Sequence, residues 1–263
     1  MKKATTIALT LFAAGAVCCF AAVGMGASNG SLKDDLSSLR SVQYQEKAED
    51  KALDQNMNIE HLVLDIDSAE CVVKTGTTNS LTGGKDVKWE RQGDTLKISQ
   101  KQRNGWWWRT KPARITLTLQ ETSLADLEIE LDAGSITVND VTATDFVRCN
   151  VDAGSAEFEN VHTGRLDLDV DAGGITFAGQ TLGPVDLECD AGGIELDLED
   201  SSIGHVSGDV DAGEISVLVN GQEALKHNGF GDTVSADLPG VTGTDMLTFD
   251  CDAGSISVKL TTK

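Results

Sequence analysis

A phrase in which apolar and polar residues alternate on either side of Asp-Ala-Gly recurs six times in this chain, and it restricts the possible folds more than any other feature. The aspartates follow one another at spacings of 20, 19, 19, 21 and 41 residues. Self-similarity at a fixed period indicates units that cannot bury their apolar faces alone and therefore stack on their neighbours. The repeated positions are Asp132, Asp152, Asp171, Asp190, Asp211 and Asp252, with Gly134, Gly154, Gly173, Gly192, Gly213 and Gly254.

Two further stretches fit the same period less well. The gap of 41 residues leaves room for a degenerate copy, and Asp232 falls close to the empty slot. Upstream, the sequence LVLDIDSAECVV around Asp67 is an earlier, divergent copy. We therefore expect the repeat to continue, with irregular copies, from about residue 57 to the end of the chain.

Within one copy the apolar residues recur at every second position. Leu166, Leu168 and Val170 alternate with aspartates, and the alternation resumes at Ile175 and Phe177 after a Gly pair. A period of two predicts strands joined by a tight turn, whereas a helix needs a period near 3.6. The sequence predicts an all-β fold, a single β-solenoid (β-helix or β-prism) with coils of about 20 residues. Two β-meanders packed as a sandwich are the alternative.

The Asp-Ala-Gly phrase predicts the corner of each coil. Ala is small and Gly tolerates positive φ, which suits a tight turn. An Asp at this place can accept hydrogen bonds from the main-chain N–H groups of its own turn. We expect the repeated Asp and Gly residues to be structural turn residues.

Four cysteines test the predicted register. Cys149, Cys189 and Cys251 lie on the apolar phase of their strands, and Cys71 takes the place that Ile175 has in its own copy. All four should point into the core. Counted along the sequence, Cys189 and Cys251 lie about three coils, or ~14 Å, apart, which is too far for a disulfide. We expect buried free thiols.

The acidic residues should form columns along the stack. One column holds the corner aspartates and a second holds Glu130, Asn150, Asp169, Glu188, Asp209 and Asp250. Like charges about 5 Å apart repel, so either bound Ca²⁺ or hydrogen bonds within the turns must compensate. We favour the turns and expect no metal and no cofactor; the calcium alternative would use Asp169, Asp171, Glu188, Asp190, Asp209 and Asp211.

Catalytic motifs are absent from the sequence. The histidines His61, His162, His205 and His227 lack the HExxH spacing, and no GxSxG, GxxxxGK[ST] or CxxC occurs. We expect a protein that is not an enzyme. The remaining enzymatic alternative is a glycosidase that assembles acids from neighbouring coils.

Charge divides the chain into a basic and an acidic part. The net charge of −21 excludes nucleic acid as a partner. Residues 85–114 nevertheless carry 9 basic against 3 acidic residues, while residues 115–263 carry 5 against 29. The tryptophans in KISQKQRNGWWWRTKPAR predict a contact with a membrane or a partner or, alternatively, a cap over the open end of the solenoid. The contact residues would be Arg103, Trp106, Trp107, Trp108, Arg109 and Lys111.

The N-terminus has the pattern of an export segment. Lys2 and Lys3 precede a stretch without charge up to about residue 30. Residues 1–27 are expected to be a signal or single-pass anchor, which places the body outside the cell membrane. Cleavage with secretion, or lipidation at Cys18 or Cys19, are alternatives. Residues 28–56 should be a polar helical linker, followed by the solenoid over 57–263, with divergent coils and a Trp hairpin in 57–120 and the repeats in 121–263.

Together these motifs resemble the DUF4097 family, also called the putative adhesin domain. The Asp-Ala-Gly copies carry most of the resemblance, with LVLDIDSAECVV, DTLKISQ and ARITLTL matching in order, over residues 58–263. The resemblance implies a β-solenoid in an exported or membrane-anchored envelope protein, and some similar proteins are linked to envelope stress. We expect a non-catalytic, adhesin-like surface module with a cell-wall, lipid or protein partner. The alternative is a stress sensor or accessory that binds anionic lipid, a membrane partner or cationic antimicrobial peptides.

Overall fold

The computed structural model describes residues 49–51, 53, 57–101, 113–120, 123–241 and 243–262, all within the unit that spans Lys47–Lys263. In this part of the chain the regular structure is all β. The expected anchor (1–27) and most of the expected linker (28–56) lie outside the described residues. A helix with the length and apolar character needed to cross a membrane is not found in the described ranges.

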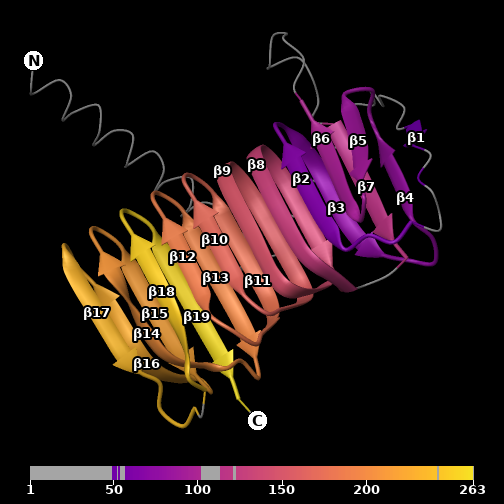
Figure 1. Ribbon diagram of the computed structural model, residues 1–263. Helices are drawn as coiled ribbons and strands as arrows, with labels where there is room; N and C mark the ends of the chain where they lie inside the picture. The colour runs from indigo at the N-terminus through magenta and orange to yellow at the C-terminus, as the bar shows by residue number, and fades with distance from the viewer. Residues whose placement is uncertain are drawn as a thin grey trace, which may run out of the picture. The chain divides into compact units, whose positions relative to one another are not determined.

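The strands follow one another along the chain without intervening helices (Figure 1). They are β1 (Glu49–Lys51), β2 (His61–Ile66), β3 (Ala69–Thr75), β4 (Ser80–Gly83), β5 (Val87–Gln92), β6 (Thr95–Gln100), β7 (Ala113–Leu119), β8 (Ser123–Asn139), β9 (Thr142–Thr163), β10 (Leu166–Val170), β11 (Gly174–Thr181), β12 (Val185–Cys189), β13 (Gly193–Glu199), β14 (Ile203–Val210), β15 (Glu214–Val219), β16 (Gln222–Asn228), β17 (Asp232–Asp237), β18 (Asp245–Cys251) and β19 (Ser255–Thr261).

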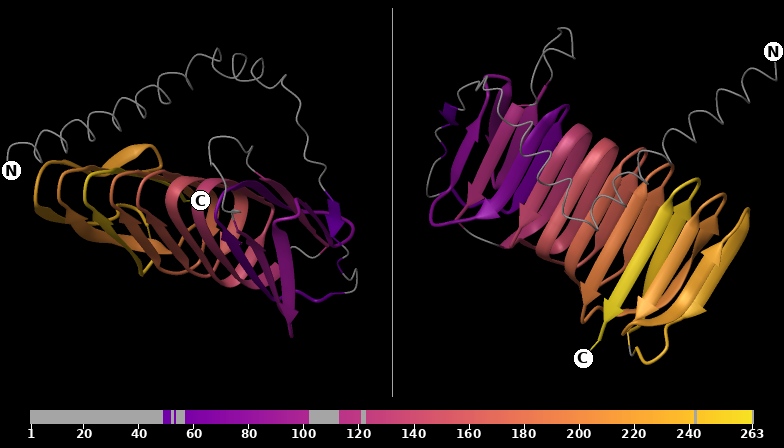
Figure 2. Two further views of the ribbon diagram at one scale, coloured as in Figure 1. Left: turned by 90° about the horizontal axis from the view of Figure 1, so that it is seen from above. Right: turned by 180° about the vertical axis from the view of Figure 1, so that it is seen from behind.

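Successive coils stack in parallel and in register, as a solenoid requires. Leu168, for example, pairs with Cys149 of one neighbouring coil and with Leu187 of the other. In the six repeated copies a coil has a first long side, the Asp-Ala-Gly corner and a second long side (Figures 1 and 2). Parallel pairing of successive coils confirms an all-β, solenoid-like fold and excludes the sandwich of antiparallel meanders for these residues.

The two long sides are defined by their strands. The first side consists, in spatial order, of β6, β2, residues 123–131 of β8, residues 142–151 of β9, then β10, β12, β18 and β14. The second side consists of β7, β3, residues 133–139 of β8, residues 153–163 of β9, then β11, β13, β19 and β15.

The spatial order of the coils differs from their order in the sequence at both ends. The first coil, β2 and β3, lies between the β6–β7 coil and β8. The last coil, β18 and β19, lies between the β12–β13 coil and the β14–β15 coil. The expectation that Cys189 and Cys251 lie three coils apart is therefore wrong, because the two residues pair directly on adjacent strands.

The outermost coils are covered by antiparallel strands. At one end β5 pairs with β6 and β4 with β7, and at the other end β17 pairs with β14 and β16 with β15. An unpaired terminal strand would offer free N–H and C=O groups to another chain, and these strands occupy them. Asp232 starts β17 and pairs with Val210, so the predicted degenerate copy in the long gap is wrong.

The prediction of a helical linker over residues 28–56 is also wrong near the C-terminal end of that range. Glu49–Lys51 form β1, which pairs antiparallel with β4. The physical reason is the same as for the other covering strands, because β4 is an edge strand with one side free for a partner.

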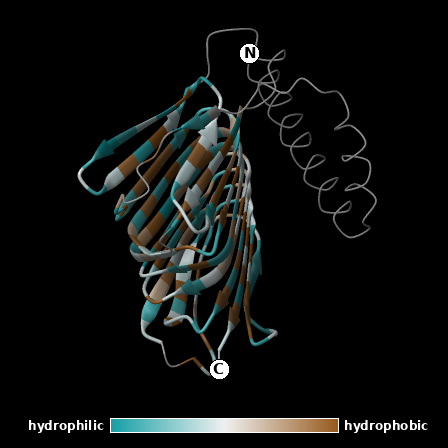
Figure 3. Ribbon diagram, turned by 90° about the vertical axis from the view of Figure 1, so that its right-hand side faces the viewer, coloured by the Kyte–Doolittle hydropathy of each residue, from teal (hydrophilic) through white to brown (hydrophobic). Residues whose placement is uncertain are grey.

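The core lies between the two sides and consists of the alternating apolar residues. Leu166, Leu168 and Val170 are fully buried, and Phe158 packs against Phe177 with 5.5 Å between ring centroids. Figure 3 shows the resulting bands of apolar and polar residues along the strands. Cys71, Cys149, Cys189 and Cys251 are all buried and free, which confirms the predicted inward register.

Close stacking, rather than positive φ, makes glycine necessary at the corners. Only Gly134 among the repeated glycines has a positive φ, of 110°. A Cβ added at Gly173 would lie 2.2 Å from the carbonyl oxygen of Gly154, and one at Gly154 would lie 2.5 Å from that of Gly134. The backbones of neighbouring coils thus touch along one column of glycines. A positive φ, which was the reason for expecting glycine at the corners, occurs only at Gly134.

A second corner was missed in the sequence. Asp140, Asp200 and Asn220, which directly follow strands of the second side, and Asn160 near the end of β9 adopt left-handed backbone conformations, with φ between 48° and 58°. Asn and Asp tolerate this region better than other residues with a Cβ. Their recurrence at about the repeat spacing was the available signal.

The glycine column leads to a prediction about stability. Gly173→Ala should lower the free energy of unfolding by about 2–4 kcal/mol, because the new methyl group collides with main-chain atoms that cannot move without shifting a coil. Gly174→Ala is the matched control, since its Cβ would meet only Gly193 O at 3.6 Å. Chemical denaturation of both variants checks this; equal losses for the two would contradict close stacking at the corner.

Candidate functional site

The outward positions of the first side form an acidic column. Asp169 pairs in register with Asn150 on one side and Glu188 on the other, Glu188 pairs with Asp250, and Asp250 pairs with Asp209. The predicted column therefore exists, but Asp250 stands between Glu188 and Asp209 because the last coil is inserted there. We call Asn150, Asp169, Glu188, Asp250 and Asp209 the acidic column.

The second side has a different outer surface. Residues paired in register from strand to strand form rows across this side. One row contains Ser155, Gly174, Gly193 and Ser255. In the next row, Thr137, Thr176 and Ser257 alternate with two glutamates. Small uncharged residues thus separate the acids there. The first side is the one on which acids follow one another from coil to coil.

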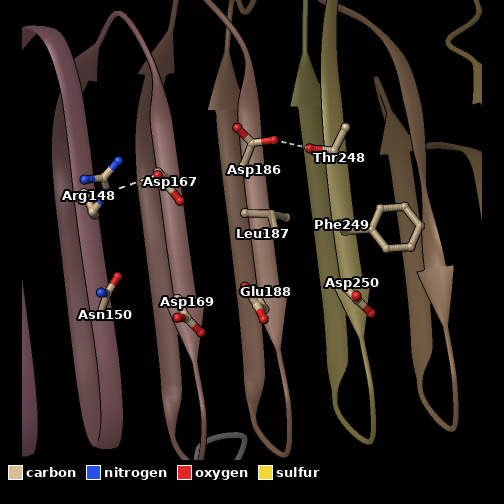
Figure 4. A pocket seen from close by; sticks show the side chains of 10 residues that line it. All are labelled: Arg148, Asn150, Asp167, Asp169, Asp186, Leu187, Glu188, Thr248, Phe249 and Asp250. Carbon is tan, nitrogen blue, oxygen red and sulfur yellow. Dashed lines mark hydrogen bonds and ion pairs between the residues drawn. The ribbon is translucent and has the colours of Figure 1, made fainter.

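The acidic column borders an open depression of about 560 Å³ on the first side (Figure 4). At its upper edge in the figure, Arg148 Nε donates to Asp167 at 3.1 Å and the Thr248 hydroxyl donates to Asp186. Asp186 also accepts from Arg165 at 2.7 Å. These partners were not singled out in the sequence, although Arg148 and Thr248 stand on the polar phase of their strands.

The centre of the column has no such compensation. Among the ion pairs of the described residues, none involves Asp169, Glu188 or Asp250. Partial burial, and then repulsion from Glu188 and the corner aspartates, raises the pKa of Asp169 to about 6. Partial burial, and then repulsion from Asp252 and Asp209, raises the pKa of Asp250. These carboxylates are therefore held together at an energetic cost.

At the other end of the first side lysines neutralise the acids. Lys101 Nζ lies 2.6 Å from Asp65 and 2.9 Å from Asp67, and Lys97 lies 3.4 Å from Asp65. Although burial acts to raise it, the pKa of Asp65 is lowered by Lys101 and then by Lys97. Lysines thus neutralise the carboxylates of the first two coils on this side, whereas Asp169, Glu188 and Asp250 of the central and C-terminal coils form no ion pair.

The corner aspartates lie at the exposed edge beside this surface. Asp132, Asp152, Asp171, Asp190, Asp211 and Asp252 are all exposed, one in each repeated coil. The hydrogen bonds at the corners run between coils through the main chain, as from Ala172 N to Asp152 O at 2.9 Å. A turn bond to each aspartate side chain stays a prediction.

The residues of the calcium alternative follow the columns from coil to coil and do not converge. Asp169, Glu188 and Asp209 belong to the acidic column, whereas Asp171, Asp190 and Asp211 lie at the corners. Within the described ranges, no group of three or more His, Cys, Asp or Glu side chains is placed to hold a metal ion.

The other predicted site residues are placed as follows. Arg103, Trp106, Trp107, Trp108, Arg109 and Lys111 fall in the segment that joins β6 to β7 and lie outside the described residues. The histidines are spread over β2, β9, β14 and β16, so they do not form one site. His61 Nδ1 lies 2.5 Å from Asp126, and this hydrogen bond raises the pKa of the histidine.

Comparison with known proteins gives one family. The model of that family, Toastrack DUF4097, matches residues 59–261. A search of curated proteins gives no match.

The solved structures that resemble the chain include the following three. A putative cell adhesion protein from Clostridium sporogenes has 14% identity and a TM-score of 0.42, over 82% of this chain and 100% of its own. A putative adhesin from Bacteroides fragilis has 14% identity and a TM-score of 0.47, over 84% of this chain and 100% of its own. A putative lipid binding protein from Parabacteroides distasonis has 11% identity and a TM-score of 0.35, over 83% of this chain and 98% of its own.

The raised pKa of Asp169 leads to a prediction about pH. Because its folded-state pKa lies above the ordinary value, this group destabilises the native state above pH 6 and ceases to do so as pH falls toward 4. Asp169→Asn should therefore raise stability at pH 7, on the order of 1 kcal/mol after solvent screening, and the gain should vanish near pH 4. Thermal melts between pH 4 and 8 check this, with exposed Glu157→Gln on the second side as control. A variant less stable than the parent at pH 7 would refute it.

Proposed function

We propose, from the premise that this chain belongs to the Toastrack DUF4097 family, that its body is a non-catalytic interaction module whose first side binds a cationic partner. The observation that carries the proposal is the acidic column, in which Asp169, Glu188 and Asp250 follow one another on adjacent strands and form no ion pair with any described residue. A bound cation would remove the repulsion that the fold maintains there.

The geometry of the column favours an extended partner with several positive charges. Neighbouring coils place carboxylates about 5 Å apart along the stack, and flexible Lys or Arg side chains can reach such a row. Each contact on an exposed surface contributes little by itself. Several contacts made by one molecule act together, because the later ones form at high effective concentration. The depression beside the column offers room for the chain of such a ligand.

The cellular setting belongs to the proposal as well. The pattern at residues 1–27 supports an exported protein, held at the cell membrane by an uncleaved anchor, with its body outside. There the module would contact a surface polymer or protein, as an adhesin does. An accessory of the envelope-stress response that captures cationic antimicrobial peptides is the second candidate, favoured by the same acidic column. In that case the tryptophan segment would bind anionic lipid or a membrane partner.

The binding proposal predicts salt-sensitive affinity for a polycation. Titration of the purified chain with oligolysine, followed by calorimetry, should show binding at low ionic strength that weakens at least tenfold near 0.5 M salt. The combined variant Asp169→Asn, Glu188→Gln and Asp250→Asn should weaken the binding about tenfold or more, because it removes the centre of the column.

The matched control removes the same number of charges from the second side. Glu157→Gln, Glu159→Gln and Asp197→Asn all change exposed residues there. This control should bind within about twofold of the parent if the site is local. An equal loss in both triple variants would show attraction to the net charge alone, and unchanged binding in the first would exclude the column.

Export and anchoring are tested on intact cells. Protease treatment should release the solenoid body while a cytoplasmic marker stays intact, and the body should fractionate with membranes before treatment. A body that resists the protease on intact cells, while a known surface protein is cleaved, would contradict the placement. A body found in the medium without treatment would support cleavage of the segment instead.

A further inference from the structure

We propose that Cys189 and Cys251 form a dithiol site that an oxidant of the disulfide class converts into an internal disulfide, which fastens the C-terminal coil into the stack. The two residues end β12 and β18, which are adjacent parallel strands. Neither the acidic column nor the proposed function involves them. The inference therefore stands or falls separately from the binding of cations.

The pairing geometry brings the two cysteines together. Cys189 and Cys251 are direct partners in the register of β12 and β18, and the ladder continues with Asp252 N donating to Cys189 O at 3.0 Å. Adjacent strands lie about 4.8 Å apart, and a disulfide requires Cα atoms within about 4.4–6.8 Å. Both side chains are fully buried on the same inner surface.

Local contacts hold both sulfur atoms at the glycine corner. A Cβ at Gly254 would lie 2.5 Å from Cys189 Sγ, and one at Gly213 would lie 2.6 Å from Cys251 Sγ. The glycines that let the coils stack therefore also leave the space that the sulfur atoms occupy. The two thiols interact with each other, and main-chain N–H groups of the corners also contact them.

The other two buried cysteines lack this arrangement. Cys149 has Ile129 and Leu168 as its partners in register, and Cys71 has Ile115 and Ile136. Burial raises the pKa of Cys71 to about 12, as expected for a thiol in apolar surroundings. In the pair, the interaction with the Cys189 thiol lowers the pKa of Cys251, although burial acts to raise it. Cys251 is therefore the thiol that more readily becomes the attacking thiolate.

The reaction is thiol–disulfide exchange and balances without any group from the protein other than the two cysteines. The Cys251 thiolate attacks one sulfur of an oxidant R–S–S–R; its S–S bond breaks, and one R–S⁻ leaves and takes up a proton. Cys189, as it loses its proton, attacks Cys251 Sγ in the mixed disulfide, and the second R–S⁻ leaves and is protonated. The two cysteines lose two electrons and two protons, and the oxidant becomes two R–SH.

The position of the bond explains what it would do for the fold. It would join the β12–β13 coil to the β18–β19 coil that stacks on it, and it would close a loop that contains β13 to β17. Closing a long loop restricts the unfolded chain and so favours the folded one. Because both sulfur atoms are buried, exchange requires either the unfolded chain or a local opening of the last coil, and the bond once formed is shielded from reductants.

The test uses the full chain, reduced and unfolded, then refolded with oxidised glutathione. Free thiols are alkylated, the protein is digested, and the peptides are identified by mass spectrometry. We expect one dominant cross-link, between the peptides that carry Cys189 and Cys251, and a melting temperature about 5–10 °C above that of the reduced chain. The native, reduced chain, treated in the same way, should form the same link more slowly.

Matched variants separate this pair from the other cysteines. Cys149→Ala and Cys71→Ala should keep both the cross-link and the rise in melting temperature, whereas Cys189→Ala and Cys251→Ala should lose both. Cys251→Ser replaces Cys251→Ala if the latter fails to refold, as judged by circular dichroism. The proposal is overturned if both thiols stay free in the refolded parent chain, or if they link to Cys71, Cys149, Cys18 or Cys19 as readily as to each other.

Discussion

In-register stacking of coils at the interstrand spacing is the constraint from which the other features of this structure follow. Parallel pairing places each residue directly on the equivalent residue of the next coil, as Leu166 on Val147 and Val185. Every position of the repeat therefore becomes a column that runs through the body. The side chains of a column must be able to lie about 5 Å from one another, whatever their type. Aliphatic columns form the core, glycine columns allow the corners to touch, and carboxylate columns accumulate charge.

The local rules of the repeat could be predicted from the sequence, and the order of its copies could not. Alternation around Leu166, Leu168 and Val170 specifies strands, their buried face and the corner between them. The same alternation is present in every copy, so it does not state which copy stacks on which. For that reason the columns of the acidic site were predicted, while the place of Asp250 within them and the contact of Cys189 with Cys251 were not.

The ends of the body were the least predictable part for a related physical reason. Covering strands such as β5 and β17 pair antiparallel with the outermost coils and no longer follow the repeat. These strands have to pair with an exposed strand edge, and this requirement does not impose the repeat on their sequences. Interpreting them as further copies of the repeat therefore gives a wrong prediction. The corners at Asp140 and Asn160 were predictable in principle, because left-handed positions favour Asn, Asp and Gly at the repeat spacing.

The inserted last coil has a consequence for how the body completes its fold. Along the middle of the stack partners are close in sequence, as with Arg148 and Asp167, which are 19 residues apart. Where the last coil enters, Asp186 meets Thr248 at a separation of 62 residues. Contacts at such separation cost more chain entropy and form later. The β14–β15 coil cannot join the stack before β18 and β19 have taken their places, so its pairing depends on the final residues of the chain. Assembly that starts from the central copies, then adds β18 and β19, and ends with the β14–β15 coil is the order that this connectivity favours.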